Sequence, residues 1–343
     1  MNRTQFLQLA GLALPFASIA SNQNTVAKNA KGIRIPPYLE AGNTIGIVAP
    51  AGYISLEEIQ PCIALLKTWG YNVLVGPHVG KQQGTFAGTD AERAADLQAM
   101  INNPAVHAIL CARGGYGCVR IIDLIDWQPL KRQPKWIIGF SDITFLHGHL
   151  QNTLRIASIH GKMCGSFDYD WSKEPTTTME LLQTLQKTWS GEPYKYTFPQ
   201  HVQQVNGTAT GVLVGGNLKC IESMAGSSSH ITGKNQILFV EDVDEALYSL
   251  DRMFWQLERA GILKNLKGLV VGGFKTKPDP NNTIPFHLCI EDMVKEKVSK
   301  YGYPVGFNFP VGHQKNNVAL KCGMVHTLHI STQENYLTDE PIR

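Results

Sequence analysis

KWIIGFSDITFLHGHL, residues 135–150, joins the pattern of a strand to the pattern of a helix. The apolar run 136–138 is typical of a buried strand, and helical spacing of apolar residues begins at Ile143. Gly139 suits a tight turn between them because it has no Cβ atom. Ser141 lies in that turn, where a hydroxyl can reach solvent and neighbouring backbone N–H groups point the same way. The stretch therefore predicts a strand–turn–helix unit with a serine at its turn.

Strand and helix patterns alternate through the first half of the chain. Strand patterns lie at residues 43–52, 71–77, 106–115 and 135–140. Helical spacing lies at residues 55–70 and 90–104 and again from residue 116, and Asp90 is the expected N-cap of the second of these helices. Because the alternation is regular, this half predicts a parallel sheet with helices on both faces.

Short strand patterns dominate the second half. They lie at residues 209–216, 236–242, 268–273, 302–308 and 325–331, with one clear helix at residues 246–261. We therefore predict an α/β protein with a smaller, β-rich domain at its C-terminus. The predicted parts are an α/β domain at 36–165, a polar connector at 166–205 and a β-rich domain at 206–333.

Charge and cysteine content argue against several classes of protein. Lys and Arg number 31 and Asp and Glu 28, so a net charge of +3 over 343 residues is not typical of nucleic-acid binding. The seven cysteines are odd in number and form no CxxC pair, which argues against a disulfide framework or a zinc site. Most are expected to be buried apolar residues. Without an HExxH motif, a P-loop or a dinucleotide fingerprint, we predict neither a metal nor a cofactor.

The N-terminus has the layout of an export signal. One positive charge at Arg3 precedes an apolar run at residues 6–20, and small residues lead up to a cleavage site near Ala20–Ser21. We therefore predict a signal peptide at residues 1–21 and a periplasmic or exported protein, the alternative being a short amphipathic leader on a cytoplasmic enzyme. The run is short for a permanent transmembrane helix, so no stable membrane insertion is expected.

Three loops are suited to chemistry, since ligands of open α/β sheets bind beyond the carboxyl ends of the strands. They are APAG at 49–52, RGGYG at 113–117 and GFSD at 139–142. Ser141 is there either the nucleophile of a strand-to-helix elbow or the N-cap of the helix. The free N–H groups of RGGYG could stabilise an oxyanion or hold a phosphate.

A serine nucleophile requires a base and usually a carboxylate that orients it. His160 and His313 both lie in loops beside glycine, and the residues alone do not choose between them. Glu241 and Asp242 end an apolar strand and are the candidate carboxylates.

Six motifs occur in an order that resembles a known family. They are ARGGYGCVRIIDLID, IIGFSDITFLH, IHGKM, LVGGNL, LFVEDVDEALYSLDRMFWQL and VGHQKNNVALKCG. Together they resemble the LD-carboxypeptidase family of serine peptidases, the muramoyltetrapeptide carboxypeptidases. A branch that cleaves microcin C-type peptide-nucleotides is similar. The resemblance extends over roughly residues 38–332.

The resemblance implies a role for five residues. Ser141 would be the nucleophile, His313 the base and Glu241 the carboxylate that orients it. The backbone N–H groups of Gly115 and Asp142 would bind the oxyanion. The implied reaction removes the terminal D-alanine from a peptidoglycan tetrapeptide through an acyl-enzyme, without a cofactor, in a protein that is commonly a homodimer.

Three further residues are candidates for substrate binding. Asn217 matches a family position that lines the cleft, and Arg113 or Lys162 could hold the free carboxylate of the substrate. Lys162 is a departure, because many members have HGP where this chain has HGKM. Two other functions stay open: a peptidase of the microcin-immunity type that accepts an aminoacyl nucleotide, and a non-catalytic exported protein that binds peptides in a cleft between its domains.

Overall fold

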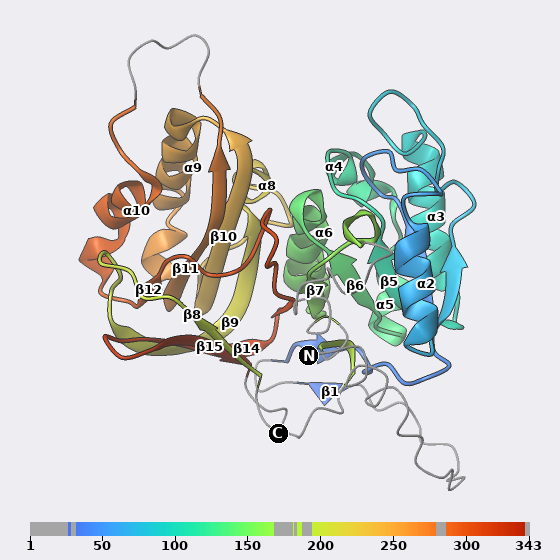
Figure 1. Ribbon diagram of the computed structural model, residues 1–343, viewed down its shortest axis with the longest axis horizontal. Helices are drawn as coiled ribbons and strands as arrows, with labels where there is room; N and C mark the ends of the chain where they lie inside the picture. The colour runs from blue at the N-terminus through green and yellow to red at the C-terminus, as the bar shows by residue number, and fades with distance from the viewer. Residues whose placement is uncertain are drawn as a thin grey trace, which may run out of the picture.

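The computed structural model describes residues 27–28, 32–167, 181, 184–186, 194–278 and 286–339. Figure 1 shows two lobes side by side, each built around its own sheet. The predicted signal peptide at residues 1–21 and much of the predicted connector lie outside the described residues. None of the helices in the described part has the length and apolar character needed to cross a bilayer.

The first sheet has six strands in the order β13-β7-β6-β5-β3-β4. Its strands are β3 (Thr44–Val48), β4 (Asn72–Val75), β5 (Val106–Cys111), β6 (Trp136–Gly139), β7 (Ser158–His160) and β13 (Leu320–Cys322). All neighbouring pairs are parallel except β13 with β7. The helices of this lobe are α2 (Gln60–Thr68), α3 (Asp90–Asn102), α4 (Cys118–Ile121), α5 (Gln128–Arg132) and α6 (Thr144–His149). The predicted parallel α/β lobe is confirmed.

The second sheet has seven strands in the order β12-β11-β10-β9-β14-β15-β8. They are β8 (Lys195–Phe198), β9 (Gly207–Asn217), β10 (Gln236–Glu245), β11 (Gly268–Thr276), β12 (Val305–Gly306), β14 (Val325–Ile330) and β15 (Asn335–Asp339). Strands β9 to β12 are parallel, and β8, β14 and β15 join them as an antiparallel extension. Helices α8 (Leu218–Ser223), α9 (Leu247–Arg259) and α10 (Ile290–Val298) belong to this lobe. A further short pair, β1 (Ala27–Lys28) and β2 (Arg34–Ile35), lies outside both sheets.

The structure corrects three details of the sequence prediction. The second lobe contains α8 and α10 in addition to the one helix expected there. Strand β13 lies within the predicted C-terminal domain but pairs with β7 of the first sheet. Helix α3 is capped by Thr89, whose side chain accepts from the Glu92 N–H, and Asp90 is its first helical residue. Thr89 and not Asp90 is the N-cap because Glu92 lies three residues after Thr89. The Glu92 side chain accepts a hydrogen bond from the Thr89 backbone N–H, which completes a capping box.

The two lobes share an apolar core at helix α6. Phe145 and Leu146 of α6 belong to the same buried cluster as Leu218 and Ile221 of α8. Figure 1 shows α6 on the side of the first lobe that faces the second. A hydrogen bond of 3.0 Å from the Asn217 N–H to the Thr144 hydroxyl joins the end of β9 to the start of this helix. The carboxyl ends of β6 and β9 are therefore held close to each other.

Six of the seven cysteines are buried, as expected for small apolar residues, and Cys289 is exposed.

Candidate active site

Ser141 lies between β6 and α6, in the predicted strand–turn–helix unit. Its φ of 62° is in the left-handed region, which residues with a Cβ atom rarely adopt. A Cβ atom at Gly114 would lie 2.9 Å from the Ser141 Cβ and 3.1 Å from its hydroxyl oxygen, so the RGGYG loop lies directly against the serine. No side-chain capping bond forms at the start of the 3₁₀ turn Ser141–Ile143 or of α6 in the described structure. The conformation fits the elbow interpretation better than the N-cap interpretation.

Glu241 and His313 form a hydrogen-bonded pair. Glu241 is fully buried in the middle of β10, opposite Asn217, the last residue of β9. Its Oε2 lies 2.7 Å from Nδ1 of His313, whose side chain is 21% exposed. Because a carboxylate can only accept, Nδ1 is the protonated nitrogen, and Nε2 is left with a free lone pair that can take a proton.

The imidazole of His313 lies beside the serine turn. The ring of Phe140, the residue before Ser141, is 5.0 Å from the His313 ring, centroid to centroid. Ser141 and His313 share no hydrogen bond among the described contacts, and such bonds commonly tighten only when substrate is present. The structure thus places the Glu241–His313 pair beside Phe140, the residue that precedes Ser141.

His160 has a different environment from His313. It is fully buried, and its ring lies 5.0 Å from Phe239 and 5.9 Å from Phe140. Neither ring nitrogen has a hydrogen-bond partner among the described residues. Burial lowers the pKa of His160 well below that of a free histidine. His160 is the last residue of β7 and does not lie in a loop as expected, and of the two histidines only His313 has a hydrogen bond to a carboxylate among the described residues.

One of the two candidate oxyanion donors belongs to the RGGYG loop, and the other directly follows the serine. Gly115 is exposed and adopts a φ of 98°. Asp142 is buried, and its Oδ2 accepts a 2.7 Å hydrogen bond from the backbone N–H of Cys118, at the far end of the RGGYG loop. Burial raises the pKa of Asp142, and the bond from Cys118 opposes that effect. The side chain of Asp142, the residue that follows the serine, is therefore hydrogen-bonded to the end of the RGGYG loop.

The three candidate substrate-binding residues differ in solvent exposure. Arg113 is exposed and donates from Nη1 to the Tyr53 carbonyl at 3.1 Å. Lys162 is buried, with its Nζ 4.7 Å from the centre of the Phe167 ring. Of the three, Arg113 alone presents its side chain at the surface.

Asn217 has a structural role that the sequence did not reveal. It is buried, caps α8 by accepting from the Cys220 N–H at 3.1 Å, and donates to Oδ1 of Asp242 at 2.9 Å. Burial raises the pKa of Asp242 to about 6. Both ends of the Asn217 amide are engaged within the protein, so Asn217 joins the end of β9 to α8 and to Asp242 of β10.

Two residues near the site were missed by the sequence analysis. Phe140 contacts both His160 and His313, and only its place before the serine could have drawn attention to it. Asn317 accepts the Gly312 N–H at 2.8 Å and thereby closes the loop that carries His313. Its signal was the polar run QKNN after the histidine. No group of three or more His, Cys, Asp or Glu residues suited to a metal ion occurs in the described part of the chain.

Two family models match the chain, one over each lobe. The LD-carboxypeptidase N-terminal domain matches residues 45–161, and the LD-carboxypeptidase C-terminal domain matches residues 210–328. The probable murein peptide carboxypeptidase of Bacillus subtilis is 32% identical over 296 residues, which cover 84% of this chain and 89% of that protein. The murein tetrapeptide carboxypeptidase of Pseudomonas aeruginosa is 28% identical over 293 residues, or 83% of this chain and 92% of that protein.

Solved structures share the fold along most of the chain. The muramoyltetrapeptide carboxypeptidase from Oxalobacter formigenes matches with a TM-score of 0.73 and 30% identity, over 87% of this chain and 98% of that one. MccF in complex with glutamyl sulfamoyl guanosine matches with a TM-score of 0.76 over 90% of this chain and 98% of that one, but its 18% identity shows likeness of fold alone. The two-lobed architecture, both family models and these relatives agree, and the chain belongs to the LD-carboxypeptidase family of peptidases.

Proposed function

We propose that this peptidase is a serine-type L,D-carboxypeptidase that releases the terminal D-alanine from peptidoglycan tetrapeptides through an acyl-enzyme. The observation that carries the proposal is the pair formed by the buried Glu241 and the partly buried His313, joined at 2.7 Å and lying beside the left-handed turn of Ser141. A serine in a strained elbow, a histidine with a free Nε2 and an orienting carboxylate are the parts of a nucleophilic triad.

The proposed mechanism follows from these positions. The Ser141 hydroxyl attacks the carbonyl of the terminal peptide bond while Nε2 of His313 takes its proton. Glu241 stabilises the imidazolium that forms, and the N–H groups of Gly115 and Asp142 bind the oxyanion, each lost donor costing roughly 3–4 kcal/mol. The C–N bond then breaks, and His313 returns the proton to the amine of the leaving D-alanine. Water attacks the acyl-enzyme with the same assistance and frees Ser141.

The substrate class is proposed from the relatives, two of which are named for murein peptides or tetrapeptides. Arg113 is the proposed partner of the free carboxylate of D-alanine, because it is exposed at the start of the loop that lies against Ser141. The predicted homodimer and the predicted export stay predictions.

The test is mass spectrometry of purified protein incubated with muropeptide tetrapeptides. We expect release of D-alanine by the wild type and no release by Ser141→Ala. Tripeptide product from Ser141→Ala at the wild-type rate would contradict the proposal. A wild type that binds tetrapeptide without cleaving it would instead identify a peptide-binding protein.

A second candidate function has one observation in its favour. Tyr116 follows Gly115, is 53% exposed, and lies with its ring 5.6 Å from that of Phe86, so an aromatic surface borders the site. Such a surface could stack on a nucleobase and would suit a peptidase that accepts an aminoacyl nucleotide. Faster cleavage of an aminoacyl sulfamoyl adenosine than of tetrapeptide, lost in Tyr116→Ala, would favour this function.

A further inference from the structure

Behind the RGGYG loop lies a buried arginine that the proposed chemistry does not use. Arg93, in the first turn of α3, has a fully buried side chain. Its Nη1 donates to the Pro50 carbonyl at 2.5 Å and to the Gly117 carbonyl at 3.0 Å. One guanidinium nitrogen thus joins the loop after β3 to the loop after β5.

The contact with the RGGYG loop is close. A Cβ atom at Gly117 would lie 2.5 Å from Nη1 of Arg93, so the backbone at this point rests directly on the guanidinium. The next residue, Cys118, donates its N–H to Asp142, the residue after Ser141. The loop is therefore held by Arg93 at Gly117 and by Asp142 at Cys118, and Gly115 lies just before these attachments.

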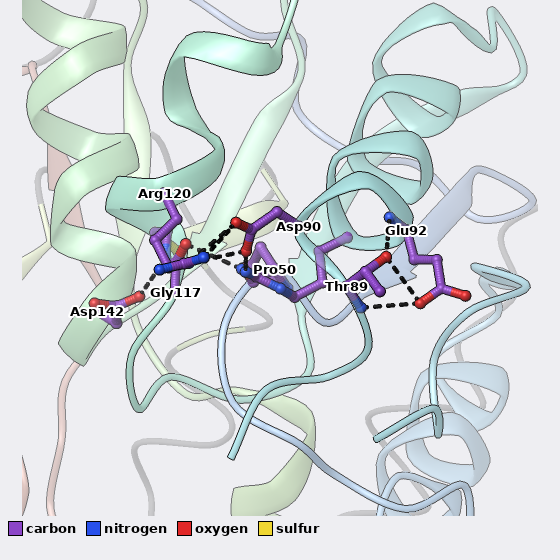
Figure 2. Close-up of polar contacts among 9 residues, drawn as sticks. Pro50, Thr89, Asp90, Glu92, Gly117, Arg120 and Asp142 are labelled. Carbon is purple, nitrogen blue, oxygen red and sulfur yellow. Dashed lines mark hydrogen bonds and ion pairs between the residues drawn. The ribbon is translucent and has the colours of Figure 1, made fainter. Parts of the chain in front are cut away.

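Surrounding groups fix the guanidinium in turn. Asp90 accepts from Nη2 of Arg93 and, at 2.7–3.1 Å, from the exposed Arg120. The ring of Phe86 lies 5.0 Å below the Arg93 guanidinium carbon. The remaining donor, Nε, has no hydrogen-bond partner among the described residues, so the Nη groups make all of the hydrogen bonds named here. Figure 2 shows Asp142, Gly117, Asp90 and Pro50 as one row that continues to the cap of α3.

A buried cation contributes to a fold only when its charge and donors are satisfied. Here Nη1 donates to backbone carbonyls of two loops at the carboxyl ends of the strands, and Nη2 donates to the carboxylate of Asp90. We propose that Arg93 is a positioning residue for the oxyanion hole: it holds the RGGYG loop so that the Gly115 N–H points at the carbonyl attacked by Ser141. This inference rests on the proposed serine mechanism. Arg93 itself touches neither substrate nor reacting atoms.

A second buried cation, Lys135, contacts the other end of α3 and provides a matched control. Lys135 is also fully buried, and its Nζ donates to the Met100 and Ile101 carbonyls at 2.8 and 2.9 Å and to the Asn103 carbonyl at 2.5 Å. It thus satisfies the carboxyl end of α3, away from the catalytic loops. Removing either cation should destabilise the lobe, but only Arg93 should affect catalysis.

The experiment compares Arg93→Met, Arg93→Lys and Lys135→Met in the full chain. For each we would measure the melting temperature, kcat and KM on tetrapeptide, and hydrogen exchange of the backbone at residues 113–118. We expect Arg93→Met to lose at least about tenfold in kcat with KM nearly unchanged, since a misplaced oxyanion donor acts on the transition state. The Cys118 amide should exchange faster. Arg93→Lys should recover part of kcat, and Lys135→Met should keep kcat and loop protection despite a lower melting temperature.

Two results would overturn the inference. One is a folded Arg93→Met with wild-type kcat and wild-type exchange at residues 113–118. The other is a loss of kcat in Lys135→Met as large as that in Arg93→Met, which would assign Arg93 to stability alone. If Arg93→Met does not fold, Arg93→Lys decides by the same criteria. If the wild type releases no D-alanine at all, the proposed function fails, and the exchange measurement still reports whether Arg93 holds the loop.

Discussion

Glu241→Gln removes the negative charge behind His313 while keeping nearly the same shape. The carboxylate is fully buried and 2.7 Å from Nδ1 of the imidazole, so its charge acts on the imidazolium with little screening by water. An amide in this place can still accept from Nδ1, or it can donate to Nδ1 and leave Nε2 in the wrong tautomer. In either case the imidazolium that forms in the proposed attack by Ser141 loses its counter-charge.

The size of the effect follows from the distance. With an effective dielectric constant of about 20, opposite unit charges 2.7 Å apart attract by about 6 kcal/mol. Each 1.36 kcal/mol of transition-state stabilisation corresponds to about tenfold in rate, so the upper bound is about 10⁴-fold. Because a neutral hydrogen bond can remain, we expect kcat to fall by about 10³- to 10⁴-fold.

The assay is release of D-alanine from tetrapeptide, with the melting temperature measured on the same preparations. Oε1 of Glu241 has no hydrogen-bond partner among the described residues, so a neutral side chain should leave the fold at least as stable as the wild type. A melting temperature near that of the wild type would therefore separate catalysis from folding. A stable Glu241→Gln protein with kcat within tenfold of the wild type would refute the role assigned to the carboxylate.

Three further substitutions test the surroundings of the serine. Gly114→Ala would place a methyl group 2.9 Å from the Ser141 Cβ, and we expect kcat to drop at least about tenfold with the fold retained; unchanged kcat would show that the loop has room to move. Burial lowers the pKa of His147 to about 4, below the value of about 6.5 in the unfolded chain, so the unfolded state takes up the proton first as the pH falls. The contribution of His147 to the free energy of unfolding should be fully present above pH 6.5 and should decrease by about 3 kcal/mol towards pH 4. The melting temperature of His147→Gln should therefore depend less on pH than that of the wild type; the same pH dependence in both proteins would contradict this. Thr144→Val leaves the buried Asn217 N–H without its acceptor and should lower the free energy of unfolding by about 1–3 kcal/mol in denaturant titrations, whereas Thr144→Ser should not; equal values for the two variants would show that this bond between the lobes is immaterial.

The local sequence was sufficient for features that depend on neighbouring residues. The first sheet follows from the alternation of strand and helix patterns, and the turn at Ser141 follows from the change of period within residues 135–150. Strand β13 could not be found in this way, because it has three residues and pairs with β7, which lies far away in the chain. A short strand is stabilised by its partner, and the pattern of its own residues carries little information about where that partner lies.

The sequence alone also could not choose between two candidate residues of the same type. His160 and His313 have similar neighbours in the sequence, and only the fold shows that one is enclosed by aromatic rings and the other faces a carboxylate. The resemblance to a family supplied what spacing did not. Nothing in the sequence indicated the role proposed for Arg93, because an arginine in an amphipathic helix is usually exposed. Its burial depends on the loops that follow β3 and β5.

The motif LVGGNL shows how packing between the lobes supports the proposed site. Glycine pairs near a strand end often indicate a ligand loop, but a Cβ atom at Gly216 would lie 2.3 Å from the hydroxyl oxygen of Thr144. The glycine is thus required for β9 to approach the first turn of α6. Thr144 follows Ser141 by three residues, and Glu241 pairs with the next residue of β9, Asn217. The contact between β9 and α6 therefore links the residue paired with Glu241 to the first turn after Ser141. A side chain at Gly216 would separate the proposed triad without touching any member of it.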